Sequence, residues 1–97
     1  MRLGRVVGTV TGTAKDPSLS GQKLLIVDLT DGNLKVVTPH QVVVDAVGAG
    51  VGDVVLVIMG SAVRQAKNAR GVATDAAAVA IVDEVTIAQV RDGKENE

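Results

Sequence analysis

The feature that most constrains this chain is a short loop with glycine at every second position. The loop covers residues 48–52, carries Gly48, Gly50 and Gly52, and lies between two valine-rich stretches that resemble strands. Glycine has no Cβ, so it adopts positive φ readily and lets a second backbone approach closely. Such a loop suits either a bound ligand or several copies of the chain that meet around a symmetry axis.

The 97-residue chain fits a single domain, but its side chains are small. It contains no Phe, Trp, Tyr or Cys, although 46% of its residues are hydrophobic. Neither aromatic packing nor a disulfide or thiolate-bound metal can therefore stabilise it. Valine and alanine each bury little area, so either they fill a tight β-barrel or some of them bury against other subunits. We favour association.

The charge balance argues against polyanionic partners. The formal net charge is −1, which provides no attraction for nucleic acid or an anionic membrane surface. No apolar run approaches the roughly 20 residues that span a bilayer, and the N-terminus lacks the apolar segment of a signal peptide. We therefore expect no nucleic-acid partner, no membrane partner and a cytoplasmic location.

Stretches rich in β-branched residues predict about six short strands and no long helix. The predicted strands cover residues 2–13, 23–30, 34–38, 41–46, 53–59 and about 78–87. We expect Ser61 to cap a short helix over 62–67, and one turn of helix over 75–77. This pattern predicts a mainly all-β, OB-like antiparallel barrel. The barrel domain is expected to cover residues 1–88, followed by a charged tail over 89–97.

Local signals refine this prediction. The dipeptide at 31–32, Asp-Gly, favours a type I′ turn or a bulged hairpin. Pro39 and His40 are expected to interrupt the strands on either side. Glycines at every fourth position of the first strand suggest bulges or close backbone approach there: Gly4, Gly8 and Gly12.

Motifs for cofactor or metal chemistry are not found. His40 is the only histidine and stands beside a proline, so we expect a surface loop residue and not a metal ligand or a catalytic base. The glycine loop reads G-x-G-x-G and precedes a strand, whereas the dinucleotide fingerprint reads G-x-G-x-x-G and opens a helix. A phosphate-loop Lys-Ser/Thr is also absent. We therefore predict no cofactor.

Four aspartates lie at strand ends or turns: Asp45, Asp53, Asp75 and Asp83. A pair of them would suit acid–base catalysis. The interpretation that we favour is that they cap turns or pair with Arg64, Arg70 or Lys67. Single-stranded nucleic acid needs a basic groove and aromatic platforms, which this chain lacks. The residues alone thus predict a small, self-associating barrel that is not an enzyme.

Several segments, in order and at matching spacing, resemble the EutN/CcmL family of pentameric vertex proteins from bacterial microcompartment shells. The segments are 6–10, 15, 19–25, 44–56, 60–64 and 75–83, so the resemblance covers about residues 2–88. Two positions depart from the family pattern. Val63 precedes Arg64 where alanine is more common, and Thr74 stands where a proline often precedes the Asp-Ala pair.

The resemblance implies a structural function. A flat sheet of hexameric tiles needs five-fold positions to close, and a tapered homopentamer of this barrel would plug one vertex and contact hexameric shell proteins. It implies no catalysis and no cofactor, and a location in the shell within the bacterial cytoplasm. The alternatives are a monomeric or dimeric barrel that binds a small ligand, and a small enzyme with a site shared between subunits.

The same picture yields candidate site residues. We expect the loop near the five-fold axis, where it would rim a narrow pore with Gly48, Ala49, Gly50, Val51 and Gly52; a structural loop away from the axis is the alternative. Ser61, Arg64, Asp75 and Asp83 are candidates for the subunit interface. Arg64 would pair with Asp75 or Asp83, either within one chain or across the interface.

Overall fold

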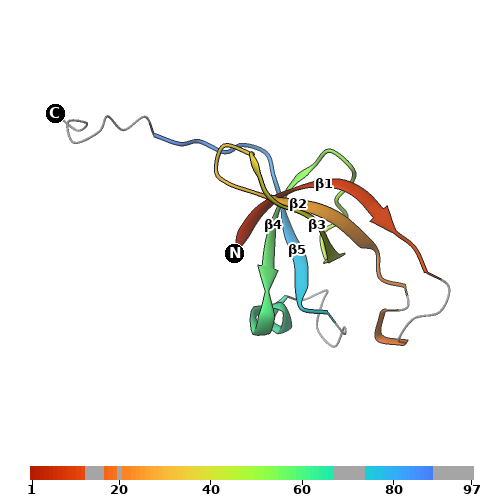
Figure 1. The fold of residues 1–97 in the computed structure, drawn as a ribbon. Helices are drawn as coiled ribbons and strands as arrows, with labels where there is room; N and C mark the ends of the chain where they lie inside the picture. The colour runs from red at the N-terminus through yellow and green to blue at the C-terminus, as the bar shows by residue number, and fades with distance from the viewer. Residues whose placement is uncertain (13–16, 20, 67–73, 89–97) are drawn as a thin grey trace.

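The computed structural model describes residues 1–12, 17–19, 21–66 and 74–88. Five strands, β1 to β5, close into a barrel in the order β1-β2-β3-β5-β4 (Figure 1). Their bounds are β1 Arg2–Val10, β2 Leu24–Thr30, β3 Val36–Asp45, β4 Val54–Met59 and β5 Ala76–Val82. Two 3₁₀ helices, η1 Pro17–Leu19 and η2 Gly60–Gln65, lie between strands. The predicted small all-β barrel is confirmed.

Neighbouring strands pair antiparallel except at the closure between β3 and β5. That contact is parallel and joins only Val44 to Ala77 and Asp45 to Ala78. The barrel interior holds small side chains, with Leu25, Val27, Val55 and Val57 fully buried. Valine, leucine and alanine therefore build the core, as expected for a tight barrel without aromatic residues.

The two predicted strands 34–38 and 41–46 are one strand, β3. Pro39 and His40 do not end it but form a bulge opposite Asp28, because Val27 pairs with Gln41 and Leu29 with Thr38. His40 takes a positive φ of 57° and donates its backbone N–H to Asp28 Oδ1 at 2.9 Å. A bulge accommodates a proline that has no N–H for the ladder. His40 is exposed, although it lies in a strand and not in a loop.

The prediction of a helical turn over 75–77 is wrong. Ala76, Ala77 and Ala78 belong to β5 and are almost fully buried, with Ala76 paired to Met59 and Ala77 to Ile58. Tertiary pairing here outweighs alanine's helix propensity, because only small side chains fit at this position of the barrel wall. The strand ends at Val82, earlier than the predicted strand.

The predicted helix over 62–67 is a 3₁₀ helix, η2, and Ser61 does not cap it. Met59 occupies the cap position without a side-chain hydrogen bond. Gly60, at φ 63°, turns the chain out of β4 and donates its N–H to Asp75 O at 2.8 Å. This backbone hydrogen bond sets the start of η2, so no side-chain cap is needed. Residue 67 lies outside the described residues.

The glycine signals in β1 are confirmed at Gly8 and Gly4. The register shifts between Val6 and Gly8, which marks a bulge. A Cβ on Gly4 would overlap Val27 Cγ1 on the neighbouring strand β2. The strand ends at Val10, before the predicted end at residue 13, which lies outside the described residues. The predicted tail over 89–97 also lies outside them. No helix in the described part of the chain is long and apolar enough to cross a membrane.

Candidate assembly site at the glycine loop

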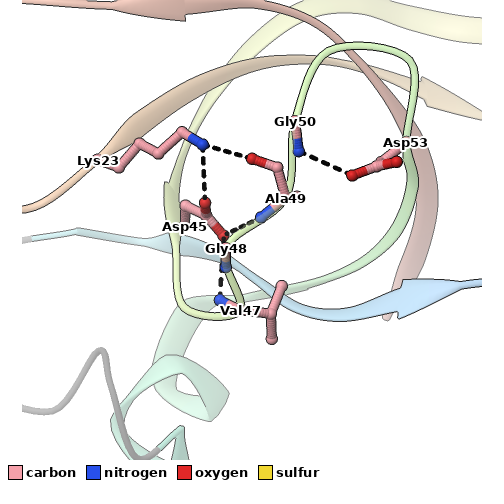
Figure 2. A network of polar contacts seen from close by, with 7 residues as sticks. All are labelled: Lys23, Asp45, Val47, Gly48, Ala49, Gly50 and Asp53. Carbon is pink, nitrogen blue, oxygen red and sulfur yellow. Dashed lines mark hydrogen bonds and ion pairs between the residues drawn. The ribbon is translucent and has the colours of Figure 1, made fainter.

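Asp45, the last residue of β3, organises the loop that follows it (Figure 2). Its Oδ1 accepts three backbone N–H groups, from Val47 at 3.0 Å, Gly48 at 2.9 Å and Ala49 at 3.2 Å. Its side chain is only 1% exposed. Hydrogen bonds from N–H groups to a carboxylate are stronger than those between neutral groups, so this aspartate fixes the first half of the loop.

Lys23 covers the other oxygen of this carboxylate. Its Nζ lies 3.6 Å from Asp45 Oδ2 and donates a hydrogen bond to Ala49 O (Figure 2). Oδ2 accepts no hydrogen bond, so the lysine supplies its compensation through charge. The Asp45 N–H also donates to Lys23 O at 2.8 Å, which places the two residues side by side. Lys23 is not among the site residues predicted from the sequence. The register of β2 and β3 would have indicated it: Leu24 pairs with Val44, so Lys23 and Asp45 come next to each other at the ends of these strands.

Asp53 fixes the second half of the loop. Its Oδ2 accepts the Gly50 N–H at 2.8 Å, and its own N–H donates to Gly50 O at 3.0 Å (Figure 2). Gly52 N–H donates to Val6 O at 2.8 Å, and Arg5 Nη1 donates to Gly52 O at 2.9 Å. The predicted turn-capping role is thus confirmed for Asp45 and Asp53, and β1 anchors the loop on its far side.

The loop is part of the barrel core. Ala49 is fully buried and belongs to the same apolar cluster as Val6, Val43 and Val55. Val51, by contrast, is 67% exposed at the outer turn. The loop therefore closes one end of the barrel with a small side chain and presents an apolar side chain to the outside.

The three loop glycines have different reasons to be glycine. Gly48 and Gly52 have φ of 81° and 97°, a conformation that L-residues with a Cβ rarely adopt. Gly50 has no positive φ, and a Cβ there would meet nothing closer than Asp53 Oδ2 at 3.9 Å. The barrel therefore accounts for Gly48 and Gly52, but it does not account for Gly50.

The predicted interface residues fall at two places. Ser61 and Asp75 are exposed and lie at one end of β5, where Gly60 bonds to Asp75. Asp83 is exposed just after the other end of β5, near the loop, because Val82 pairs with Val54. The Arg64 backbone belongs to η2, but its side chain lies outside the described structure, so its predicted pairing stays a prediction. Within the described residues, Asp75 and Asp83 form no ion pair.

The described residues contain no group of three or more His, Cys, Asp or Glu side chains that could hold a metal ion. The polar groups that do converge, on Lys23, Asp45 and Asp53, hold backbone N–H and C=O groups of the loop. This arrangement defines a class: a small β-barrel with exposed valines on its outer wall, in which buried and half-buried charged groups hold a glycine-rich loop in place.

Comparison with known proteins narrows this class to a family. The model of the family described as ethanolamine utilisation protein EutN/carboxysome matches residues 1–83. The bacterial microcompartment shell vertex protein GrpN of Rhodospirillum rubrum is 49% identical over 85 residues, which cover 88% of this chain and 96% of GrpN. The carboxysome shell vertex protein CcmL of Synechococcus elongatus is 40% identical over 87 residues, covering 90% and 88%.

The solved structure of the GrpN pentameric microcompartment shell protein from Rhodospirillum rubrum superposes with a TM-score of 0.81 at 48% identity, covering 91% of this chain and 100% of that one. The chain belongs to the EutN/CcmL family of microcompartment shell proteins, as the sequence resemblance predicted.

Proposed function

We propose that five copies of this chain form a ring that fills a five-fold vertex of a microcompartment shell and contacts hexameric shell proteins at its rim. The similar GrpN is described as a pentameric shell protein, and both GrpN and CcmL are described as vertex proteins. These relatives align with this chain over nearly their full lengths.

The observation that carries the proposal is the apolar outer surface of the barrel. Val36, Val37, Val42 and Val51 are each more than half exposed, and Ile81 is 42% exposed. A soluble barrel of this size gains nothing from leaving these side chains in water. Contact with neighbouring copies would bury them, and it would add apolar burial to a core built from small side chains.

The loop proposal rests on Gly50. Its backbone conformation and its surroundings within the chain leave room for a Cβ, so an approach by another copy is the simplest reason for a glycine there. Five loops that meet at an axis would provide that approach, with the exposed Val51 beside it. The loop residues 48–52 would then rim a narrow axial pore.

The proposed seam uses the two ends of β5. Ser61 and Asp75 would face a neighbour at one end, and Asp83 at the other. β5 has seven residues, so Asp75 and Asp83 are separated by more than about 20 Å of extended chain. An arginine in η2 cannot span that distance, so a contact between Arg64 and Asp83 would have to join two copies.

The mass of the native protein tests the ring. Light scattering or native mass spectrometry of the full chain should give five times the 9.9 kDa of one chain. A monomer or dimer over the whole concentration range would contradict the ring. Vertex function is tested separately by co-expression with hexameric shell proteins: closed shells should form with this chain, and open sheets or tubes without it. Neither comparison supports the alternative of a ligand-binding barrel, and the named relatives are structural proteins.

A further inference from the structure

After β5 the chain continues as an extended segment over residues 83–88, here called the arm. The arm pairs with no strand of the described structure, and it leaves the barrel beside the β2–β3 turn (Figure 1). Val85 and Ile87 alternate with Glu84 and Thr86, which is the period of a strand. Ile87 is 54% exposed. An extended segment with this pattern offers its backbone N–H and C=O groups to a further strand.

β3 offers an edge that such a strand can use. One edge of β3 pairs with β2, whereas the other edge meets β5 only at Val44 and Asp45. Residues 36–43 therefore have no strand neighbour on that second edge in the part of the chain that the structure describes. The edge begins with Val36 and Val37, which are 54% and 57% exposed. An uncovered apolar edge is a template for an added strand.

A strained residue lies beside this edge. Leu34, in the β2–β3 turn, has a φ of 63°, which is unfavourable for leucine. Its side chain lines a hollow of about 330 Å³ together with Gly32, Asn33, Val85 and Ile87. Strained conformations persist where the surrounding structure or a function requires the side chain. The turn and the arm thus share one hollow beside the start of the β3 edge, and a leucine occupies a position there whose backbone conformation suits glycine.

We propose that the arm of one copy lies along the free edge of β3 in the next copy around the ring and adds a strand to that barrel. The proposal rests on the pentamer proposed above. The occupant is a second copy because this one chain carries both the arm and the edge. The charges also match: Asp83 and Glu84 of the arm are exposed, and Lys35 is exposed at the start of the edge. Such a head-to-tail contact forms a closed ring when the rotation from one copy to the next divides a full turn evenly.

Cysteine pairing tests this contact directly, since the chain has no cysteine of its own. Val37→Cys and Thr86→Cys would be placed on separate, differently tagged copies and co-expressed. Oxidation of the purified pentamers should link the two tags, because each copy carries one thiol and the two thiols meet only if the arm of one copy lies along the β3 edge of the next. Neither variant alone should cross-link. Thr9→Cys, exposed on β1, replaces Val37→Cys as the control and should not link to the arm.

A proline gives an independent measurement. Thr86→Pro removes one N–H from the arm, and Thr86→Ala removes the side chain but keeps that N–H. We expect the dissociation constant of the pentamer to rise about tenfold or more with proline and to stay nearly unchanged with alanine. Intact pentamers that neither cross-link nor respond to proline would overturn the arm contact and leave the ring standing. Cross-linking of either single variant by itself would also overturn it. A wild-type chain that forms no pentamer would instead overturn the proposed function.

Discussion

The ammonium group of Lys23 lies between the carboxylate of Asp45 and the carbonyl of Ala49, and so connects the residue just before β2 to the loop that closes the barrel. The two partners differ in exposure: the Lys23 side chain is 49% exposed, whereas that of Asp45 is 1% exposed. The lysine therefore retains part of its hydration while it compensates a carboxylate that has lost nearly all of its own.

Lys23→Met should destabilise the barrel, because it leaves the buried Asp45 Oδ2 without a positive charge. Since the lysine is half exposed and its charge is partly screened, we expect a loss of about 1–2 kcal/mol and not the larger cost of a fully buried pair. Urea unfolding at one fixed protein concentration measures it. Thr9→Met, at an exposed side chain of β1 away from the loop and the proposed contact, is the control for introducing a methionine and should change little. Equal losses in both variants would contradict the role of Lys23.

Gly4→Ala should destabilise the barrel by about 1–3 kcal/mol, since its Cβ would overlap Val27 Cγ1 and force the core apart. Gly12→Ala is the control, because a Cβ at Gly12 meets nothing within 4 Å. That variant should be neutral or slightly more stable, as the alanine lowers the entropy of the unfolded chain. The unfolding temperature of both variants measures the effect. A Gly4→Ala barrel as stable as the wild type would contradict the prediction, because it would show that the strands separate easily enough to admit the Cβ.

Gly50→Ala and Gly52→Ala should separate assembly from folding. Gly52, at φ 97°, should lose about 1–2 kcal/mol of barrel stability when it gains a Cβ. Gly50→Ala has no such strain, so the barrel should unfold as in the wild type while the pentamer dissociates more readily. Sedimentation and unfolding would be measured on the same samples. A Gly50→Ala pentamer of unchanged stability would place the loop away from the contact between copies.

Leu34→Gly should relieve the backbone strain at φ 63°, which would stabilise the barrel by about 1 kcal/mol. The loss of the partly buried leucine side chain would offset part of this gain. The barrel should therefore be as stable as the wild type or more so. The pentamer should be weaker, because the leucine side chain is lost from the hollow beside the arm. Leu34→Asn, which tolerates the same φ, serves as the second variant. If assembly is unaffected by both, the strained leucine has no part in the interface.

The sequence predicted the barrel well because the strand signals were local. The β-branched runs, the bulge at Gly8 and the hairpin turn that begins at Asp31 all depend on neighbouring residues, although the positive φ of that turn falls on Leu34 and not on Gly32. The errors came from long-range pairing. Pro39 and His40 look like a break until Asp28 is seen opposite them, and residues 76–78 look helical until β4 pairs with them. Lys23 was missed for the same reason, since nothing near it in the chain points to Asp45.

The site was predicted in part. The glycine spacing drew attention to the loop, and the turn-capping interpretation of Asp45 and Asp53 was right, because carboxylates beside a glycine-rich turn commonly accept its N–H groups. The distinction between Gly50 and its two neighbours was not predictable from sequence. It depends on backbone dihedrals and on the space around each Cα, which the spacing alone does not encode.

The burial of Ala49 has a consequence for transport through a vertex. A loop that holds a core side chain, and that is tied down by Lys23, Asp45 and Asp53, cannot swing aside without partial unfolding of the barrel. If this loop rims the axial opening, that opening is a fixed orifice and not a gate. Its permeability would then be determined by the residue types at positions 48–52 and would stay the same whatever the metabolic state of the compartment.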